Sequence, residues 1–183
     1  MIIRRIEKVD NQRIAALIRA PFDEYDMEKQ HTVYDDETTD HQYEVFKNCA
    51  SSVLWVAEDQ GKVIGSCGVY STEGLPEGWC EIVKFYVDQN ERGKGTGSIL
   101  FEKALQSAVS LGYHTAYLET FPEFAGAVKL YERLGFKRID HQVGSSGHTA
   151  TSIWMTKTLR TESFDDQAMR RKVLGSVGDA HER

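Results

Sequence analysis

The sequence contains no long hydrophobic run: no stretch approaches the roughly 18 consecutive apolar residues of a membrane-spanning helix. Residues 1–7 also lack the apolar stretch of a secretory signal peptide. Cysteine is scarce, and the three thiols of Cys49, Cys67 and Cys80 show no C-x-x-C spacing. An odd count without that spacing argues against a disulfide framework or a zinc site and favours a reducing compartment. We therefore expect a cytoplasmic protein with no bound metal and no membrane partner.

Positive charge is not in excess either. The 22 Lys and Arg residues face 28 Asp and Glu residues, which gives a formal net charge of −6. Nucleic-acid-binding domains usually present a basic face, so no nucleic-acid partner is expected. A length of 183 residues with 40% hydrophobic residues suits one globular domain with a sizeable core. We assign it to residues 1–160, as a monomer or homodimer, and residues 161–183 to a charged tail in which 167–174 is the candidate for a short helix.

The hydrophobic pattern predicts strands and helices in alternation. Gly61 marks the turn of an early hairpin, and Pro21 is expected to end the first helix. Antiparallel hairpins followed by strand–helix–strand units predict an α/β (α+β) fold, with a mixed, mostly antiparallel sheet flanked by helices on both faces. The predicted strands are 2–6, 53–57, 62–70, 79–87, 115–120, 136–142 and 151–159, and the predicted helices are 11–20, 98–111 and 122–134.

A glycine-rich loop joins the fourth predicted strand to the second predicted helix. Gly93, Gly95 and Gly97 alternate there, and glycine allows positive φ angles and a close approach of ligand to backbone. The start of a helix also offers unpaired N–H groups and the positive end of the helix dipole. Arg92 and Lys94 add positive charge. This combination predicts an anion site, and phosphate is the usual anion at such a site.

Two common nucleotide-binding loops do not match. A P-loop needs G-x-x-x-x-G-K-[ST], but Asp88 stands five residues before Gly93. A dinucleotide fingerprint needs G-x-G-x-x-G/A, but Ser98 or Leu100 occupies its last position here. The failed patterns weaken a nucleotide-binding interpretation. A tight turn that binds nothing stays open as the structural alternative.

Two motifs together resemble the GNAT family of N-acetyltransferases. Residues 92–97 match the pattern [QR]-x-x-G-x-[GA] at Arg92, Gly95 and Gly97, and residues 130–136 match L-Y-x-x-x-G-F. The resemblance implies a GNAT-type acyl-CoA acyltransferase fold with acetyl-CoA as co-substrate. It further implies transfer of the acetyl group to a primary amine of a small molecule or peptide, by direct attack on the thioester. The alternative is a non-catalytic module of the same fold that senses acyl-CoA.

The resemblance also assigns cofactor-binding residues. The loop amides hold the coenzyme A pyrophosphate, and a bulge splays the preceding strand from the next one so that the pantetheine arm can pair with its backbone. The N–H of Phe85 would face the thioester oxygen, as an oxyanion-stabilising donor. Phe124 replaces an asparagine that often contacts the arm, and Ala127 is expected to pack there instead. The implied set is Phe85, Tyr86, Val87, Arg92, Gly93, Lys94, Gly95, Thr96, Gly97, Ser98, Ala127 and Tyr131.

Two side chains are implied in proton transfer. Tyr131 aligns with the tyrosine that protonates the leaving thiolate, although a core-packing role is the alternative. Glu81 matches the general base of the histone acetyltransferase branch, and two-residue alternation predicts that 81, 83, 85 and 87 share one face. Apolar neighbours would raise the pKa of Glu81, while a cross-strand ion pair is the alternative. Glu119 or ordered water could serve as the base instead.

The acceptor site is expected to be built by residues 21–45. Nine acidic residues lie there, with Lys29 as the only Lys or Arg. Such a segment could attract a cationic amine, or it could be an ordinary solvated loop.

Overall fold

The computed structural model describes residues 1–159, so the predicted tail helix at 167–174 lies outside the described residues. Most predicted strands and helices are present, with shifted ends. In chain order the elements are β1 (Ile2–Arg5), α1 (Asn11–Glu24), α2 (Gln42–Lys47), β2 (Val53–Asp59), β3 (Lys62–Tyr70), β4 (Trp79–Val87), α3 (Thr96–Ser110), β5 (Thr115–Thr120), α4 (Ala125–Arg133), β6 (Lys137–Ile139) and β7 (Ile153–Thr158).

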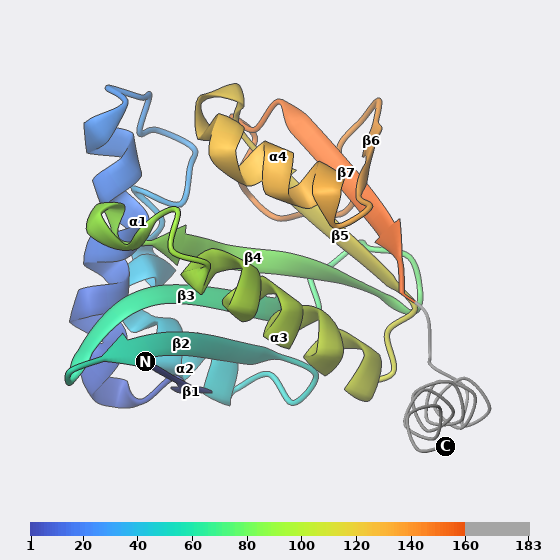
Figure 1. Ribbon diagram of the computed structural model, residues 1–183. Helices are drawn as coiled ribbons and strands as arrows, with labels where there is room; N and C mark the ends of the chain where they lie inside the picture. The colour runs from blue at the N-terminus through green and yellow to red at the C-terminus, as the bar shows by residue number, and fades with distance from the viewer. Residues whose placement is uncertain (160–183) are drawn as a thin grey trace, which may run out of the picture.

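The strands form one seven-stranded sheet in the order β1-β2-β3-β4-β5-β7-β6. Every neighbouring pair is antiparallel except β4 and β5, which run parallel. Helices α3 and α4 cover one face, and α1 and α2 cover the other (Figure 1). The predicted mixed, mostly antiparallel sheet with helices on both faces is therefore confirmed.

Each face of the sheet has its own apolar core. Under α3, Leu100 and Phe101 are fully buried and belong to the larger cluster of buried residues. Under α1, Ile14 and Ile18 are fully buried against the opposite face. Burying one such side chain contributes about 1.5–3 kcal/mol, so the amphipathic helices are held by packing on the sheet.

Strands β4 and β5 diverge in the middle of the sheet. They pair only where Trp79–Glu81 lies beside Thr115–Tyr117, and beyond that point the two strands separate (Figure 1). A β-bulge lies on the same stretch of β4: the register with β3 shifts so that Lys84 and Phe85 together oppose Cys67. Bulges increase twist and re-aim side chains, which fits the opening between the two strands.

Three local predictions are wrong. Pro21 does not end the first helix, which continues to Glu24 because the amide of Tyr25 still bonds the Pro21 carbonyl (3.0 Å) and Phe22 is fully buried. The segment after it is not wholly irregular, since it contains α2. The strand predicted at 136–142 is limited to Lys137–Ile139, where it pairs with β7.

Candidate active site

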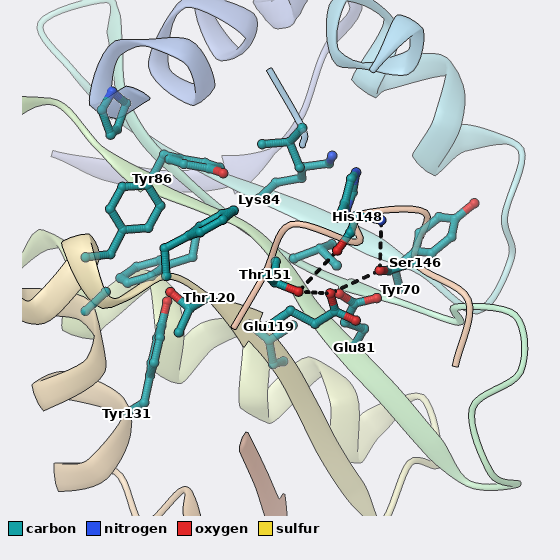
Figure 2. A pocket seen from close by; sticks show the side chains of 18 of the residues that line it. Tyr70, Glu81, Lys84, Tyr86, Glu119, Thr120, Tyr131, Ser146, His148 and Thr151 are labelled. Atoms are coloured by element: carbon teal, nitrogen blue, oxygen red, sulfur yellow. Dashed lines mark hydrogen bonds between the residues drawn. The ribbon is translucent and has the colours of Figure 1, made fainter. Parts of the chain in front are cut away.

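A cavity of about 970 Å³ opens where β4 and β5 separate. It is lined by the second half of β4, the glycine loop, the end of β5, one side of α4 and the segment Ser145–Thr151. Figure 2 shows Tyr86 and Tyr131 toward one end of the cavity, and Glu119, Ser146 and His148 toward the other. The splayed strands thus bring residues from distant parts of the sequence around one space.

The glycine loop has the geometry of an anion site. Gly93 and Gly95 have φ angles of 77° and 91°, a region that side chains strain, and α3 begins immediately afterwards at Thr96. A Cβ on Gly97 would lie 3.2 Å from the Phe85 ring, so the start of the helix packs closely on β4. The unpaired amides of this first helical turn therefore lie beside the cavity.

The loop cations are engaged by protein groups. Arg92 lines the cavity, but it donates to Glu24 (2.8 Å) and to the Val87 carbonyl (3.2 Å). Lys94 lies 3.2 Å from Glu91. Neither Lys94 nor the buried Thr96 is among the cavity-lining residues, whereas Gly93, Gly95, Gly97 and Ser98 are. Backbone amides, more than side-chain charge, are thus available to an anion.

The bulge corrects the predicted facing of β4. Residues 81, 83, 85 and 87 do not share one face, because the extra residue at Lys84 reverses the alternation. Phe85 packs against Phe101 of α3 (ring centroids 5.1 Å apart), while Val83 and Tyr86 pack on the α1 side. Even so, β4 residues on both sides of the bulge, Phe85, Tyr86 and Val87 among them, border the cavity, because it extends through the gap between the strands.

Tyr131 projects from α4 into this gap. Its side chain is only 6% exposed and packs against Phe101 (5.2 Å between centroids) and Phe85 (6.0 Å), yet it also lines the cavity. Burial, and to a lesser extent Cys67 and Tyr86, raise the pKa of the phenol well above its usual value. The hydroxyl therefore stays protonated near neutral pH and carries a proton that it can donate.

Glu81 is the last residue of β4 that pairs with β5, and it is 5% exposed. Burial raises its pKa to about 7, with a further small rise from Glu119, while a hydrogen bond from the Thr72 hydroxyl and the charge of Lys84 oppose the shift. No basic group lies within ion-pair distance of Glu81 in residues 1–159. The cross-strand ion pair considered from the sequence is therefore absent from this part of the chain.

Glu119, the second candidate base, organises a loop. Its carboxylate accepts hydrogen bonds from Gln142 (3.0 Å), Ser146 (3.1 Å) and Thr151 (2.9 Å), as Figure 2 shows for the last two. It also accepts one from the Tyr117 hydroxyl (3.0 Å). A carboxylate with four donors is poorly suited to take a proton from a substrate, because protonation would disrupt these bonds.

Among the charged cavity residues, Lys84 and His148 were not identified from the sequence, and Asp36 was included only as a member of the acidic segment 21–45. His148 Nε2 lies 3.3 Å from Asp36 Oδ2, and burial together with the charge of Lys84 lowers the histidine pKa. Lys84 has a positive φ angle of 54°, unusual for a non-glycine residue, and its carbonyl accepts from Ser66 Oγ (2.7 Å). The resemblance implied a bulge at the end of this strand, but the residue pattern did not place it at Lys84, because the position of a bulge depends on pairing with another strand.

Most of the acidic segment 21–45 serves the fold. Asp23 pairs with Lys29 (2.6 Å), and Asp40 pairs with Arg19 (2.7 Å). Others accept backbone amides or bond to neighbouring side chains, and among the nine only Asp36 lines the cavity. This favours the solvated-loop alternative over a dedicated attractor for cations.

An aromatic cluster replaces the asparagine contact expected near α4. Phe124 packs against Phe22 and Phe121 (5.8 and 5.7 Å between centroids) and against Tyr25 (6.1 Å). Ala127, predicted to face the cofactor arm, lines the cavity together with Phe124. The wall at this point is therefore apolar.

The described residues contain neither a membrane-spanning helix nor a cluster of metal ligands. None of the helices in residues 1–159 is long and apolar enough to cross a bilayer. In the same residues, no group of three or more His, Cys, Asp or Glu side chains could hold a metal ion.

Comparison with known proteins gives consistent results. The acetyltransferase (GNAT) family matches residues 14–136. The uncharacterized N-acetyltransferase YjgM of Escherichia coli (strain K12) is 34% identical over 160 residues, covering 86% of this chain and 95% of the relative. An acetyltransferase of GNAT family from Staphylococcus aureus Mu50 superposes with a TM-score of 0.75 at 19% identity, covering 87% of this chain and 99% of that one. The yncA structure from Salmonella typhimurium, solved with its cofactor acetyl-CoA, gives 0.69 at 22% identity, covering 89% and 96%.

Proposed function

Because this chain belongs to the GNAT acetyltransferase family and is an N-acetyltransferase, we propose that its donor is acetyl-CoA and its acceptor a primary amine of a small molecule or peptide. The observation that carries the proposal is that Glu81 and Tyr131 border the same cavity as the glycine loop. An anion site, a buried acid with a raised pKa and a protonated phenol are the groups that acyl transfer from a thioester requires.

The loop and the gap between β4 and β5 support the donor assignment. The pyrophosphate would bind the amides of residues 92–98, at the start of α3. The pantetheine arm would then lie along Phe85, Tyr86 and Val87, against the apolar wall that includes Ala127. A structural neighbour was solved with acetyl-CoA, which supports acetyl-CoA as the donor.

The reaction then follows from the positions of three groups. Glu81 accepts a proton from the acceptor ammonium, and the amine nitrogen attacks the thioester carbonyl carbon. The N–H of Phe85 stabilises the oxyanion of the tetrahedral intermediate. Collapse breaks the carbon–sulfur bond, and Tyr131 donates its proton to the leaving thiolate. The nitrogen loses its second proton as the amide forms, which restores the Tyr131 phenol, and Glu81 releases the first proton to solvent. The products are an amide, coenzyme A and one proton, and no other reactant is needed.

The same proposal includes the setting of the enzyme. The thiols of Cys49, Cys67 and Cys80 are all free, which agrees with a reducing compartment such as the cytoplasm. Burial raises the pKa of Cys80 to about 12, so this thiol is inert. We assign the activity to a single domain over residues 1–160.

A thiol-release assay with acetyl-CoA and a panel of amines tests the function. Release of coenzyme A that depends on both the amine and the enzyme is the expected result. Tight coenzyme binding without turnover of any amine would instead indicate an acyl-CoA sensor. Thermal stabilisation by ATP and not by coenzyme A would instead indicate a nucleotide-binding protein.

A further inference from the structure

Lys84 lies in the cavity at the point where β4 bulges. Its backbone is in the left-handed region, with φ at 54°, and Ser66 fixes it by a hydrogen bond to its carbonyl (2.7 Å). Strained positions of this kind persist where the surrounding structure holds them, and they concentrate at functional sites. Figure 2 shows the Lys84 side chain directed toward the His148 side of the cavity, away from the Tyr131 end. The conformation thus places the Lys84 ammonium group in the part of the cavity opposite Tyr131, the proposed proton donor to the thiolate.

Within the described part of the chain, the Lys84 ammonium group has no hydrogen-bonded or ion-paired partner. No hydrogen bond or ion pair from Lys84 Nζ is found within residues 1–159. Burial lowers the pKa of this group. Arg92, which also lines the cavity, differs in that it bonds Glu24 (2.8 Å). A half-buried cation without a hydrogen-bonded anion is unfavourable, so a ligand that supplies an anion would be stabilised there.

The neighbouring acids are each occupied or partly neutral. Asp36 acts on Lys84 at a distance, but its carboxylate accepts from Thr38 (2.8 Å) and faces His148. Glu119 is saturated by the donors that hold the segment Ser145–Thr151. Glu81 has its pKa raised to about 7 and is the proposed base. None of the three reaches Lys84 within ion-pair distance, which leaves its ammonium available to a ligand.

The acidic Glu81 and the basic Lys84 on β4 are complementary to the ammonium and carboxylate groups of an amino acid. Glu81 and Lys84 are three residues apart, so their Cα atoms are separated by about 10 Å along the strand. Both line the cavity, and the charge of each acts on the other. A molecule that carries an ammonium and a carboxylate a few atoms apart presents the complementary pair: its ammonium toward Glu81 and its carboxylate toward Lys84.

We propose that Lys84 binds a carboxylate of the acceptor, so that the substrate is a small amino acid whose amine is acetylated beside Glu81. This inference rests on the proposed function and narrows its acceptor class. It makes Lys84 a specificity-determining residue. It does not depend on the acidic segment 21–45 attracting a cationic amine, because only one of the nine acidic residues there lines the cavity.

Matched substrate pairs provide the test. The kcat/KM for each of several α-, β- and γ-amino acids is compared with that of the corresponding carboxamide, in the wild type and in Lys84→Met. Because a carboxamide has a more acidic amine than its parent, the measure is the change in the carboxylate-to-carboxamide ratio between the two proteins. We expect the ratio to fall about tenfold or more in Lys84→Met, through a higher KM for the carboxylates, since a charge-assisted contact is lost.

Two further variants keep the test selective. Lys84→Arg retains the charge and should keep much of the preference. Lys137→Met removes an exposed lysine on β6, away from the cavity, and should leave the ratio at its wild-type value. Unchanged coenzyme A affinity in Lys84→Met shows that the variant is folded.

The outcomes separate the two proposals. Turnover of amines with the same ratio in wild type and Lys84→Met would overturn the role of Lys84 and leave the acetyltransferase proposal standing. Carboxamides preferred by the wild type, with no effect of Lys84→Met, would do the same. Coenzyme A binding without turnover of any amine would overturn both.

Discussion

At the scale of single residues, burial prepares both proton carriers for a reaction near neutral pH. Burial raises the pKa of Glu81 to about 7, which is close to the value that suits a general base in this range. The same cause raises the pKa of Tyr131 well above that of a free phenol, which keeps it protonated near neutral pH but makes it a weaker acid, so its proton must move as the thiolate departs. Desolvation thus sets the resting protonation state of both side chains.

Glu81→Gln is expected to lower kcat by roughly 100-fold or more, the usual contribution of a general base. In the wild type, kcat/KM should rise with pH through about 7 as the carboxyl loses its proton, and Glu81→Gln should lose that limb. A pH–rate profile measures both effects. Glu123→Gln, an exposed change outside the cavity, is the control. An unchanged profile would point to water or Glu119 as the base.

The same substitution should stabilise the protein at alkaline pH. The pKa of Glu81 is higher in the folded state (about 7) than the ordinary value of 4.5, so the folded protein binds more protons in this interval and loses stability as pH rises through it. The penalty above pH 7 is on the order of 3 kcal/mol. Chemical denaturation at pH 5 and pH 8 should therefore show that Glu81→Gln is stabilised relative to the wild type by a larger amount at pH 8 than at pH 5. A gain that is equal at both values would contradict the raised pKa.

Tyr131→Phe should lower kcat by roughly 100-fold, since it removes a general acid. The ring contacts with Phe101 and Phe85 are retained, so coenzyme A affinity should change less than about threefold. Tyr113→Phe is a matched control, because that hydroxyl bonds the Ser51 carbonyl (2.7 Å) outside the cavity. Steady-state kinetics and calorimetry measure the two quantities. A wild-type kcat in Tyr131→Phe would assign the tyrosine to core packing alone.

At the scale of elements, the site depends on how β4 ends and how α3 begins. The bulge at Lys84 turns the strand, and the left-handed glycines that follow direct the first amides of α3 toward the cavity. Packing also decides where elements stop. Helix α1 passes Pro21 because Phe22, fully buried among other aromatic side chains, holds its last turn in place.

Gly95→Val should raise the coenzyme A dissociation constant at least about 100-fold, because a side chain would fill the space where the pyrophosphate meets the loop amides. Gly112→Val is the matched control, because the φ angle of Gly112 (90°) is within a degree of that of Gly95 (91°). At both positions an added Cβ atom would have no neighbouring atom within 4 Å. Both variants therefore carry similar backbone strain. Isothermal titration should show weak binding only in Gly95→Val, and equal affinities would exclude the loop as the phosphate site.

At the scale of the whole molecule, the sheet is joined across its centre by a short contact. Strands β4 and β5 pair over three residues and then separate, so the cavity lies between two groups of strands (Figure 1). A cofactor in this gap would contact both groups and replace the strand pairing that the divergence removes. Binding of the cofactor should consequently stabilise both groups of strands together against unfolding.

Acetyl-CoA should raise the melting temperature in a concentration-dependent way. At 100 times its dissociation constant, a ligand specific to the folded state adds about 2.7 kcal/mol, which is a shift of roughly 5–10 °C for a chain of this size. Differential scanning fluorimetry measures the shift, with ATP at equal concentration as control. A larger shift with ATP would contradict the donor assignment.

The sequence by itself determined the features that depend on local spacing. Glycines at alternate positions before a helix require no knowledge of the rest of the fold, and neither does the L-Y-x-x-x-G-F pattern that identified Tyr131. Strand and helix periods likewise follow from which residues must be buried, which is why β3, β4 and β5 were predicted with their observed bounds.

The tertiary structure alone decided which side chains meet. Asp36, Lys84 and His148 come from three separate segments, and only the sheet topology places them in one cavity. The facing of Phe85 depends on a bulge, and a bulge is a property of two paired strands. The carboxylate of Glu119 accepts a hydrogen bond from Thr151, in a loop far along the chain. Such features follow from strand register and long-range packing, which local sequence spacing does not specify.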